Sequence, residues 1–498
     1  MDKKALKLLF SRSDWNETTI QEADKLIGRL AKEYLGLDTY PNQFEVVTSE
    51  QMLDAYSLVG LPLSYHHWKF GKDFVINENN YKKGRMGLAY ELVINSNPCI
   101  SYNMEDNTTC LTLLVLAHAA YGHNHFFKNN YLFKQWTNAD SIVDYLIFAR
   151  KYISVCEEKY GYEEVELVLD AGHALMNYGV DKYKKPTVIS PGAEKERLKK
   201  KVEDNRVLLN DIWRTVPKID EKPLNPIVFP LQPEENILYF IEKNSPVLKE
   251  WQREIIRIVR KIAQYFYPQG QTKVINEGCA TFTHYELINQ LYEKGFLDDG
   301  FMLEFMHHHS NVIYQPDFDS KYYAGINPYT LGFAIFSDLK RMSISPTEED
   351  FKWFPSIAGK ESWQETFRSI VENYKDETFV LQFLSPTVIR DLHLFEIHDE
   401  INKDHVLISH IHDEFGYKAI RKSLSEWYNR ARYVPDIQVL DVCVYGDRCL
   451  TLDYTSLDEK EILISQAKNV IDYVRFLWGF PVKLIEDGDV SKVLVEVK

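Results

Sequence analysis

Three histidines lie close together in the segment AHAAYGHNHFF, where they are His118, His123 and His125. Neutral imidazole is the commonest side-chain ligand for metal ions, and zinc, iron and nickel all accept it. His118 and His123 could therefore share one ion. Their spacing is unusual for this purpose, because residues five apart on a regular α-helix point about 140° away from each other.

Two local structures would bring these two rings together. The helix could break at Gly122, or it could contain a π-helical turn, which aligns residues five apart and is frequent at functional sites. The alternative is that these histidines belong to the core and are held there by hydrogen bonds. The sequence leaves both interpretations open.

A second segment, VINEGCATFTHYE, places a carboxylate and an imidazole on one helix face. Glu277 and His284 are seven residues apart, which is about 10 Å along a helix, so one ion could hardly bind both. We therefore predict one ligand and one supporting partner, since a ligating histidine usually has such a partner. Alternatively, Glu277 is only an acid near a helix N-terminus, where the helix dipole favours negative charge.

Two further segments combine histidines with acids. Glu304 and His307 have the E-x-x-H spacing of carboxylate-bridged di-iron bundles, and His309 is the other option. Three adjacent histidines are also compatible with an exposed surface. Asp170 and His173 lie three apart and could bind an ion or form ion pairs on a helix surface.

The composition excludes several classes of protein. A formal net charge of −15 disfavours nucleic-acid or anionic-membrane partners, because both reward a basic surface. The longest apolar run, residues 111–120, is half of the ~20 residues that span a bilayer, and the N-terminus lacks the apolar core of a signal peptide. The six cysteines show no C-x-x-C spacing, which indicates reduced thiols. We therefore predict a cytoplasmic protein.

Hydrophobic spacing predicts an α+β protein with a large, mainly helical N-terminal domain and a small C-terminal module. Helices are expected at 15–35, from about 108, and at 139–160, 163–178, 251–267 and 276–293. Three arginines of the 251–267 helix, Arg253, Arg257 and Arg260, are expected to neutralise buried acids. From residue 401 the expected order is strand 404–411, helix 416–431, hairpin 436–456, helix 459–479 and strands 481–487 and 492–497. This order indicates a ferredoxin-like module at 401–498, after a first domain at 1–400.

Four long motifs are AHAAYGHNHFFKNNYLFKQW, VINEGCATFTHYELINQLYEKG, INPYTLGFAIFSDLKR and VYGDRCLTLDY. They resemble the stage V sporulation protein R (SpoVR) family over nearly the whole chain. The resemblance implies a cytoplasmic protein connected, in spore formers, with making the peptidoglycan cortex. It also implies a pathway shared with a PrkA-type serine kinase. Relatives in bacteria that do not sporulate imply a broader cell-wall or stationary-phase role.

The family pattern falls on a short set of residues: His118, Gly122, His123, Asn276, Glu277, His284, Glu304 and His309. His125, His307 and His308 depart from the pattern. This departure favours His309 over His307 as the partner of Glu304.

Two functions follow from these residues. One is a metal-dependent hydrolase of a peptide or wall precursor, because the G-H and N-E-G-x-A motifs resemble gluzincin-type zinc peptidases. In those enzymes a glutamate follows the first histidine, and here that position is Ala119, so water activation lacks its usual base. The other, which we favour, is a regulator with a buried His/Glu site for a divalent metal such as zinc. The predicted metal ligands are His118, His123, Glu277 and His309, and the predicted catalytic residues are Glu277, Glu304 and His284.

Overall fold

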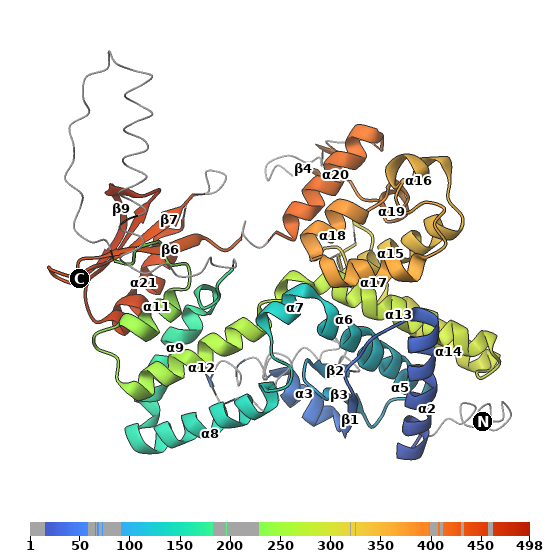
Figure 1. Ribbon diagram of the computed structural model, residues 1–498, viewed down its shortest axis with the longest axis horizontal. Coiled ribbons are helices and arrows are strands. Elements are labelled where there is room, and N and C mark those ends of the chain that lie inside the picture. The colour runs from blue at the N-terminus through green and yellow to red at the C-terminus, as the bar shows by residue number, and fades with distance from the viewer. Residues whose placement is uncertain are drawn as a thin grey trace, which may run out of the picture. The chain divides into compact units, whose positions relative to one another are not determined.

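The computed structural model describes residues 15–57, 91–182, 229–318, 320–323, 325–395, 412–429, 433–456 and 462–498, together with positions 65, 67, 68, 72, 196, 397–398 and 407–408. It forms two compact units. The first contains residues 1–155 and 265–430, and the second contains residues 156–264 and 431–498. Most of the described chain is helical, as predicted (Figure 1). Among the described helices, none combines the length and the apolar character needed to cross a bilayer.

The first unit is a helical body with a small sheet. Its helices are α2 (Glu17–Leu30), η1 (Ala31–Leu35), α3 (Ser49–Ser57), α5 (Thr109–Val115), η2 (Leu116–His123), α6 (Asn124–Asn129), α7 (Tyr131–Trp136), most of α8 (Ile142–Tyr160), η4 (Gln269–Gln271), α13 (Lys273–Glu293), α14 (Asp299–Val312), α15 (Pro328–Ile344), α16 (Glu348–Trp353), α17 (Trp363–Asn373), α18 (Asp376–Phe383), α19 (Pro386–Asp391) and α20 (Glu414–Trp427). Strands β1 (Asn42–Val47), β3 (Cys99–Met104) and β2 (Glu91–Ile94) form the sheet in that order. β1 is parallel to β3, and β2 is antiparallel to it.

Helix α13 lies at the centre of this unit. It packs against α15 on one side and against η2 on another, and Figure 1 shows α5, η2 and α6 as one continuous helix beside it. Both contacts are unusually close. A β-carbon on Gly122 would lie 2.5 Å from the Cα of Ala280, and one on Gly278 would lie 2.5 Å from the Cα of Gly332. Glycine is therefore required where these helix backbones meet.

The second unit contains helices α9 (Tyr162–Ala174), η3 (Met176–Tyr178), α11 (Ile237–Asn244), most of α12 (Glu250–Phe266) and α21 (Ile464–Trp478). Its sheet has the order β6 (Asp436–Val442), β7 (Leu450–Thr455), β8 (Val482–Glu486) and β9 (Asp489–Val497). β6–β7 and β8–β9 are antiparallel pairs, whereas β7 and β8 are parallel and are connected through α21.

The predicted hairpin 436–456, the following helix and the last two strands are confirmed. The ferredoxin-like arrangement is not confirmed. The described part of the expected first strand is β5 (Leu407–Ile408), which pairs with β4 (Ile397–His398) rather than with this sheet, and α20 packs on α18 in the first unit. A strand and a helix near a boundary can join either neighbouring unit, and hydrophobic spacing does not say which.

Packing also joins α11 and the residue that follows it to helix α21. Phe240 stacks on Trp478 with 5.9 Å between ring centroids, and the Ser245 hydroxyl donates to the Leu477 carbonyl at 2.8 Å. The predicted boundary at residue 400 stays a prediction.

The arginines of α12 neutralise a buried acid, as predicted. The Glu242 carboxylate is fully buried and accepts hydrogen bonds from Arg257 at 3.0 Å and from Arg260 at 3.1 Å. Arg253 instead donates to the backbone carbonyls of Glu242 and Ser245. An unpaired carboxylate would be costly here, so these guanidinium groups are part of the fold of the second unit.

The close contact between α13 and α15 gives a first prediction. Gly332→Ala should destabilise the protein by about 1–3 kcal/mol, because the new methyl group meets backbone atoms that cannot move aside easily. Gly300→Ala, in the first turn of α14, is the matched control, since its nearest new contact is 3.5 Å away. Thermal unfolding followed by circular dichroism should show a lower melting temperature for Gly332→Ala alone. Equal melting temperatures would contradict the requirement for glycine.

Candidate metal centre

A π-helix brings His118 and His123 together. The segment Leu116–His123 is π-helical, and all its residues are buried. The two rings lie 4.7 Å apart between centroids and almost perpendicular, at 78°. Of the two local structures predicted for this spacing, the π-helical turn is therefore confirmed, and helix continues through Gly122 into α6. The wider turn aligns residues five apart, which a regular helix does not do.

Helix α13 supplies the carboxylate. Asn276 and Glu277 are the fourth and fifth residues of this helix, and the contact between Gly122 and Ala280 brings this part of α13 against η2. The Nε2 atom of His123 lies 3.4 Å from Oε2 of Glu277, and the Nε2 atom of His118 lies 3.7 Å from it. On the other side of its ring, the Nδ1 atom of His123 lies 3.0 Å from Oδ1 of Asn276. Asn276 thus fixes the orientation of the His123 ring.

The geometry of these three groups fits a small cation. One ligand atom from each of His118, His123 and Glu277 lies within 4.8 Å of the other two. Ligands of a tetrahedral zinc ion, each ~2.0–2.2 Å from the metal, lie about 3.3 Å apart. Oε2 of Glu277 is buried and makes no hydrogen bond to the described residues. A buried carboxylate oxygen that accepts no hydrogen bond normally has another partner, and a bound cation could be that partner here. The two imidazole nitrogens that face this oxygen could be the other ligands of the cation.

Electrostatics favour an ionised carboxylate at this position. Burial alone would raise the pKa of Glu277, but the neighbouring imidazoles of His123 and then His118 hold this pKa well below its usual range. The group is therefore available as an anionic ligand at neutral pH.

Two more histidines continue the site away from the carboxylate. Nδ1 of His118 lies 2.8 Å from Nδ1 of His284, and Nε2 of His284 lies 2.9 Å from Nδ1 of His309. His284 is completely buried, and burial, followed by the nearby His118 and His309, lowers its pKa well below the usual value. Burial likewise lowers the pKa of His309 to about 4. Both rings are therefore neutral at neutral pH.

The other predicted residues lie elsewhere. Glu304 is half-exposed, accepts a hydrogen bond from the Thr108 hydroxyl at 2.5 Å and lies 3.6 Å from His308. His307 lies 3.4 Å from the amide of Asn311 on the same helix. The structure therefore brings together five of the six predicted site residues, namely His118, His123, Glu277, His284 and His309. The sixth, Glu304, makes its contacts at the start of α5.

Two histidines outside this group, His125 and His173, have structural partners. His125 is buried, its Nδ1 lies 3.1 Å from the backbone nitrogen of Asp38, and burial lowers its pKa to about 4. His173 belongs to the second unit, where its Nδ1 lies 3.2 Å from the sulfur of Met176. Neither residue belongs to a group of three ligands among the described residues.

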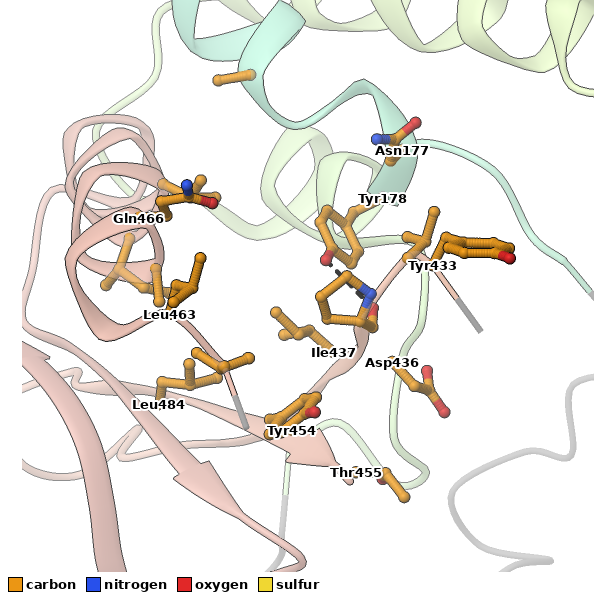
Figure 2. A pocket seen from close by; sticks show the side chains of 17 residues that line it. Asn177, Tyr178, Tyr433, Asp436, Ile437, Tyr454, Thr455, Leu463, Gln466 and Leu484 are labelled. Atoms are coloured by element: carbon orange, nitrogen blue, oxygen red, sulfur yellow. Dashed lines mark hydrogen bonds between the residues drawn. The ribbon is translucent and has the colours of Figure 1, made fainter. Parts of the chain in front are cut away.

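A pocket of about 440 Å³ in the second unit is the other candidate site (Figure 2). It lies between the end of α9, the start of β6 and α21. Its wall combines aliphatic side chains with Tyr178, whose hydroxyl already donates to the Pro435 carbonyl at 3.1 Å. Among the described residues that line it, Asp436 is the charged one. Such a pocket could hold a small molecule, but its described lining contains no histidine and only one carboxylate, unlike the cluster in the first unit.

Asp376 is an important residue that the sequence did not reveal. It is the first residue of α18, and its buried carboxyl accepts a hydrogen bond from the backbone nitrogen of Ile275 at 2.9 Å. It also receives backbone hydrogen bonds from Lys273 and Val274 and so holds the N-terminus of α13. No local signal could have identified it, because its partners are about a hundred residues earlier in the chain.

Asp376 should make stability depend on pH. Burial raises its pKa to about 7 despite the backbone hydrogen bonds. Because the folded pKa lies above the unfolded one, the protonated carboxyl is favoured in the folded state, and this stabilisation is lost as pH rises from about 4 through about 7. Wild type should therefore lose melting temperature relative to Asp376→Asn between about pH 5 and about pH 8. Asp413→Asn, at the exposed N-cap of α20, should follow wild type, and parallel curves for all three proteins would contradict the assignment.

Comparison with known proteins agrees with the motifs. The family model described as "SpoVR like protein" matches residues 14–433, and the model described as "SpoVR-like C-terminal domain" matches residues 435–489. The chain is 54% identical over 483 residues to "Uncharacterized protein YcgB" of Escherichia coli (strain K12), with 96% of this chain and 94% of the relative covered. No solved structure matches it. The chain therefore belongs to the SpoVR family.

Proposed function

We propose that this protein is a metal-dependent regulator of sporulation or cell-wall formation, in which His118, His123 and Glu277 bind one divalent cation such as zinc. The observation that carries this proposal is the convergence of these three ligand atoms on a buried carboxylate oxygen. Two imidazoles and a carboxylate form a common zinc ligand set, and iron and nickel also accept imidazole. The cation would join η2 to α13 at their point of closest approach.

The biological part of the proposal rests on the family. Its name connects it with sporulation, and we place the chain in the cytoplasm, in the pathway that makes the spore cortex or a related part of the cell wall. A PrkA-type serine kinase is the proposed member of the same pathway. In bacteria that do not sporulate, the same site would serve a cell-wall or stationary-phase function.

A metallohydrolase is the second candidate. It is favoured by the number of ligands, because three protein ligands leave a coordination position open, as in catalytic zinc sites. A zinc ion there would polarise a carbonyl group or lower the pKa of water. The residue after His118 is Ala119, a buried methyl group where gluzincin-type enzymes have their general base. His284 contacts two other histidines and does not replace that base, so we place the regulator first.

Metal content tests the proposed ligands. The protein purified without a histidine tag should contain about one zinc equivalent per chain, or bind one after dialysis against zinc chloride. Glu277→Gln should reduce zinc affinity at least 10-fold, because it removes the anionic ligand. Glu304→Gln is the matched control and should retain the affinity of wild type, since Glu304, on α14, contacts Thr108 at the start of α5 and is not one of the three proposed ligands. Full zinc affinity in Glu277→Gln would exclude the proposed site.

Turnover separates the two candidate functions. We expect the zinc-loaded protein to leave peptidoglycan-derived stem peptides uncleaved in a mass-spectrometric assay, because the position of the general base is occupied by Ala119. Zinc-dependent cleavage that Glu277→Gln abolishes and Glu304→Gln preserves would favour the hydrolase instead.

A further inference from the structure

His118, His284 and His309 form an unbroken chain of three imidazoles. The two links measure 2.8 Å and 2.9 Å, which is within hydrogen-bonding distance. His118 is the proposed cation ligand at one end, and His309 comes from a different helix, α14. Two neutral imidazoles can form a hydrogen bond only when one donates and the other accepts, so each link has a direction.

Only two patterns satisfy both links with neutral rings. In the first, His118 carries its hydrogen on Nδ1 and donates to His284, and His284 donates from Nε2 to His309. In the second, His309 donates from Nδ1 to His284, His284 donates from Nδ1 to His118, and His118 carries its hydrogen on Nε2. The tautomer of His118 therefore fixes the tautomers of the other two.

The carboxylate of Glu277 distinguishes the two patterns. Nε2 of His118 faces Oε2 of this carboxylate at 3.7 Å. Without a cation, an N–H group at this position is favoured over a lone pair, because the lone pair would face a negative charge. With a cation between them, the lone pair is required, because a histidine ligand must be deprotonated at its ligating nitrogen.

We propose that the three histidines form a tautomeric switch that transmits the occupancy of the cation site from His118 to His309. This inference rests on the proposed cation site and extends it to two residues that are not ligands of the triad. When His118 ligates through Nε2, one proton leaves that nitrogen for solvent. The shared protons move from His284 to His118 and from His309 to His284, and one proton enters at Nε2 of His309 from water. Each ring begins and ends neutral.

The surroundings of the three imidazoles favour a change of tautomer over the protonation of one ring to an imidazolium ion. His309 is 2% exposed and lies among the aromatic rings of Phe305, Tyr285 and Phe333, with centroids 5.7, 4.9 and 4.8 Å away. Phe305 also contacts the ring of His284. An imidazolium ion is disfavoured among such neighbours, so moving protons along the chain costs less than charging one ring.

Nuclear magnetic resonance of protein labelled with ¹⁵N at its histidine rings tests the proposal, since ring nitrogen shifts distinguish the two tautomers. On addition of zinc chloride, the spectrum of His309 should change from the Nδ1–H to the Nε2–H form although it is not a ligand. The ring nitrogen shifts of His125, which is buried but is not one of the three linked imidazoles, should not change. Unchanged shifts at His118 and His123 would show that zinc does not bind and would overturn the proposed function. Changes there with no change of tautomer at His309 would overturn the switch alone.

Two variants of His309 provide a second readout. His309→Phe keeps the packing among aromatic rings but cannot form a hydrogen bond with His284. Zinc affinity should therefore fall about 10-fold, which is the smaller effect expected when a metal ligand loses its hydrogen-bonded partner. His309→Asn offers both an oxygen acceptor and an amide donor near the position of Nδ1 and should restore most of the affinity. Equal affinity in wild type and both variants, measured by competition with a chelator, would contradict the proposed coupling. Equal melting temperatures of the apo-proteins would show that the fold is retained.

Discussion

The close approach of three helix backbones is the constraint on which the first unit depends. Gly122 meets Ala280, and Gly278 meets Gly332, so α13 is held against η2 on one side and α15 on the other. No side chain larger than hydrogen fits at these glycines without displacing backbone. This packing brings Glu277, near the start of α13, to the two imidazoles of η2, and the candidate ligand atoms converge because the backbones do.

The π-helix is the second half of the same arrangement. A regular α-helix packed at the same distance would present one of His118 and His123 to Glu277 and direct the other away. The π-helical turn has a cost in hydrogen-bond geometry, and its place in a fully buried segment between two regular helices indicates that packing stabilises it. Asp376 completes the arrangement from α18, because it holds the backbone nitrogens of the first turn of α13, directly before Glu277.

Much of the local structure could be predicted from the sequence. Hydrophobic spacing identified the long helices and the C-terminal strands, and the five-residue interval between His118 and His123 indicated a π-helical turn as one of two solutions. Histidine chemistry alone could not separate a ligand from a partner of a ligand, so His309 was predicted as a ligand, and in the structure it contacts His284. Asp376 could not be identified, because its role depends on a contact between distant segments. The sheet that the predicted strand 404–411 would join depends in the same way on tertiary contacts, and its described part pairs with β4.

The second unit is assembled from two separated stretches of chain, residues 156–264 and 431–498. During synthesis on the ribosome, α9 and α11 are made long before the elements that they pack against, α21 for α9 and β6 for α11. The Phe240 ring cannot pack on Trp478 until α21 has been synthesised. The nascent chain therefore carries an unfinished half-domain from residue 264 until residue 431, and every helix of the candidate metal centre, from α5 to α18, is synthesised before β6 begins.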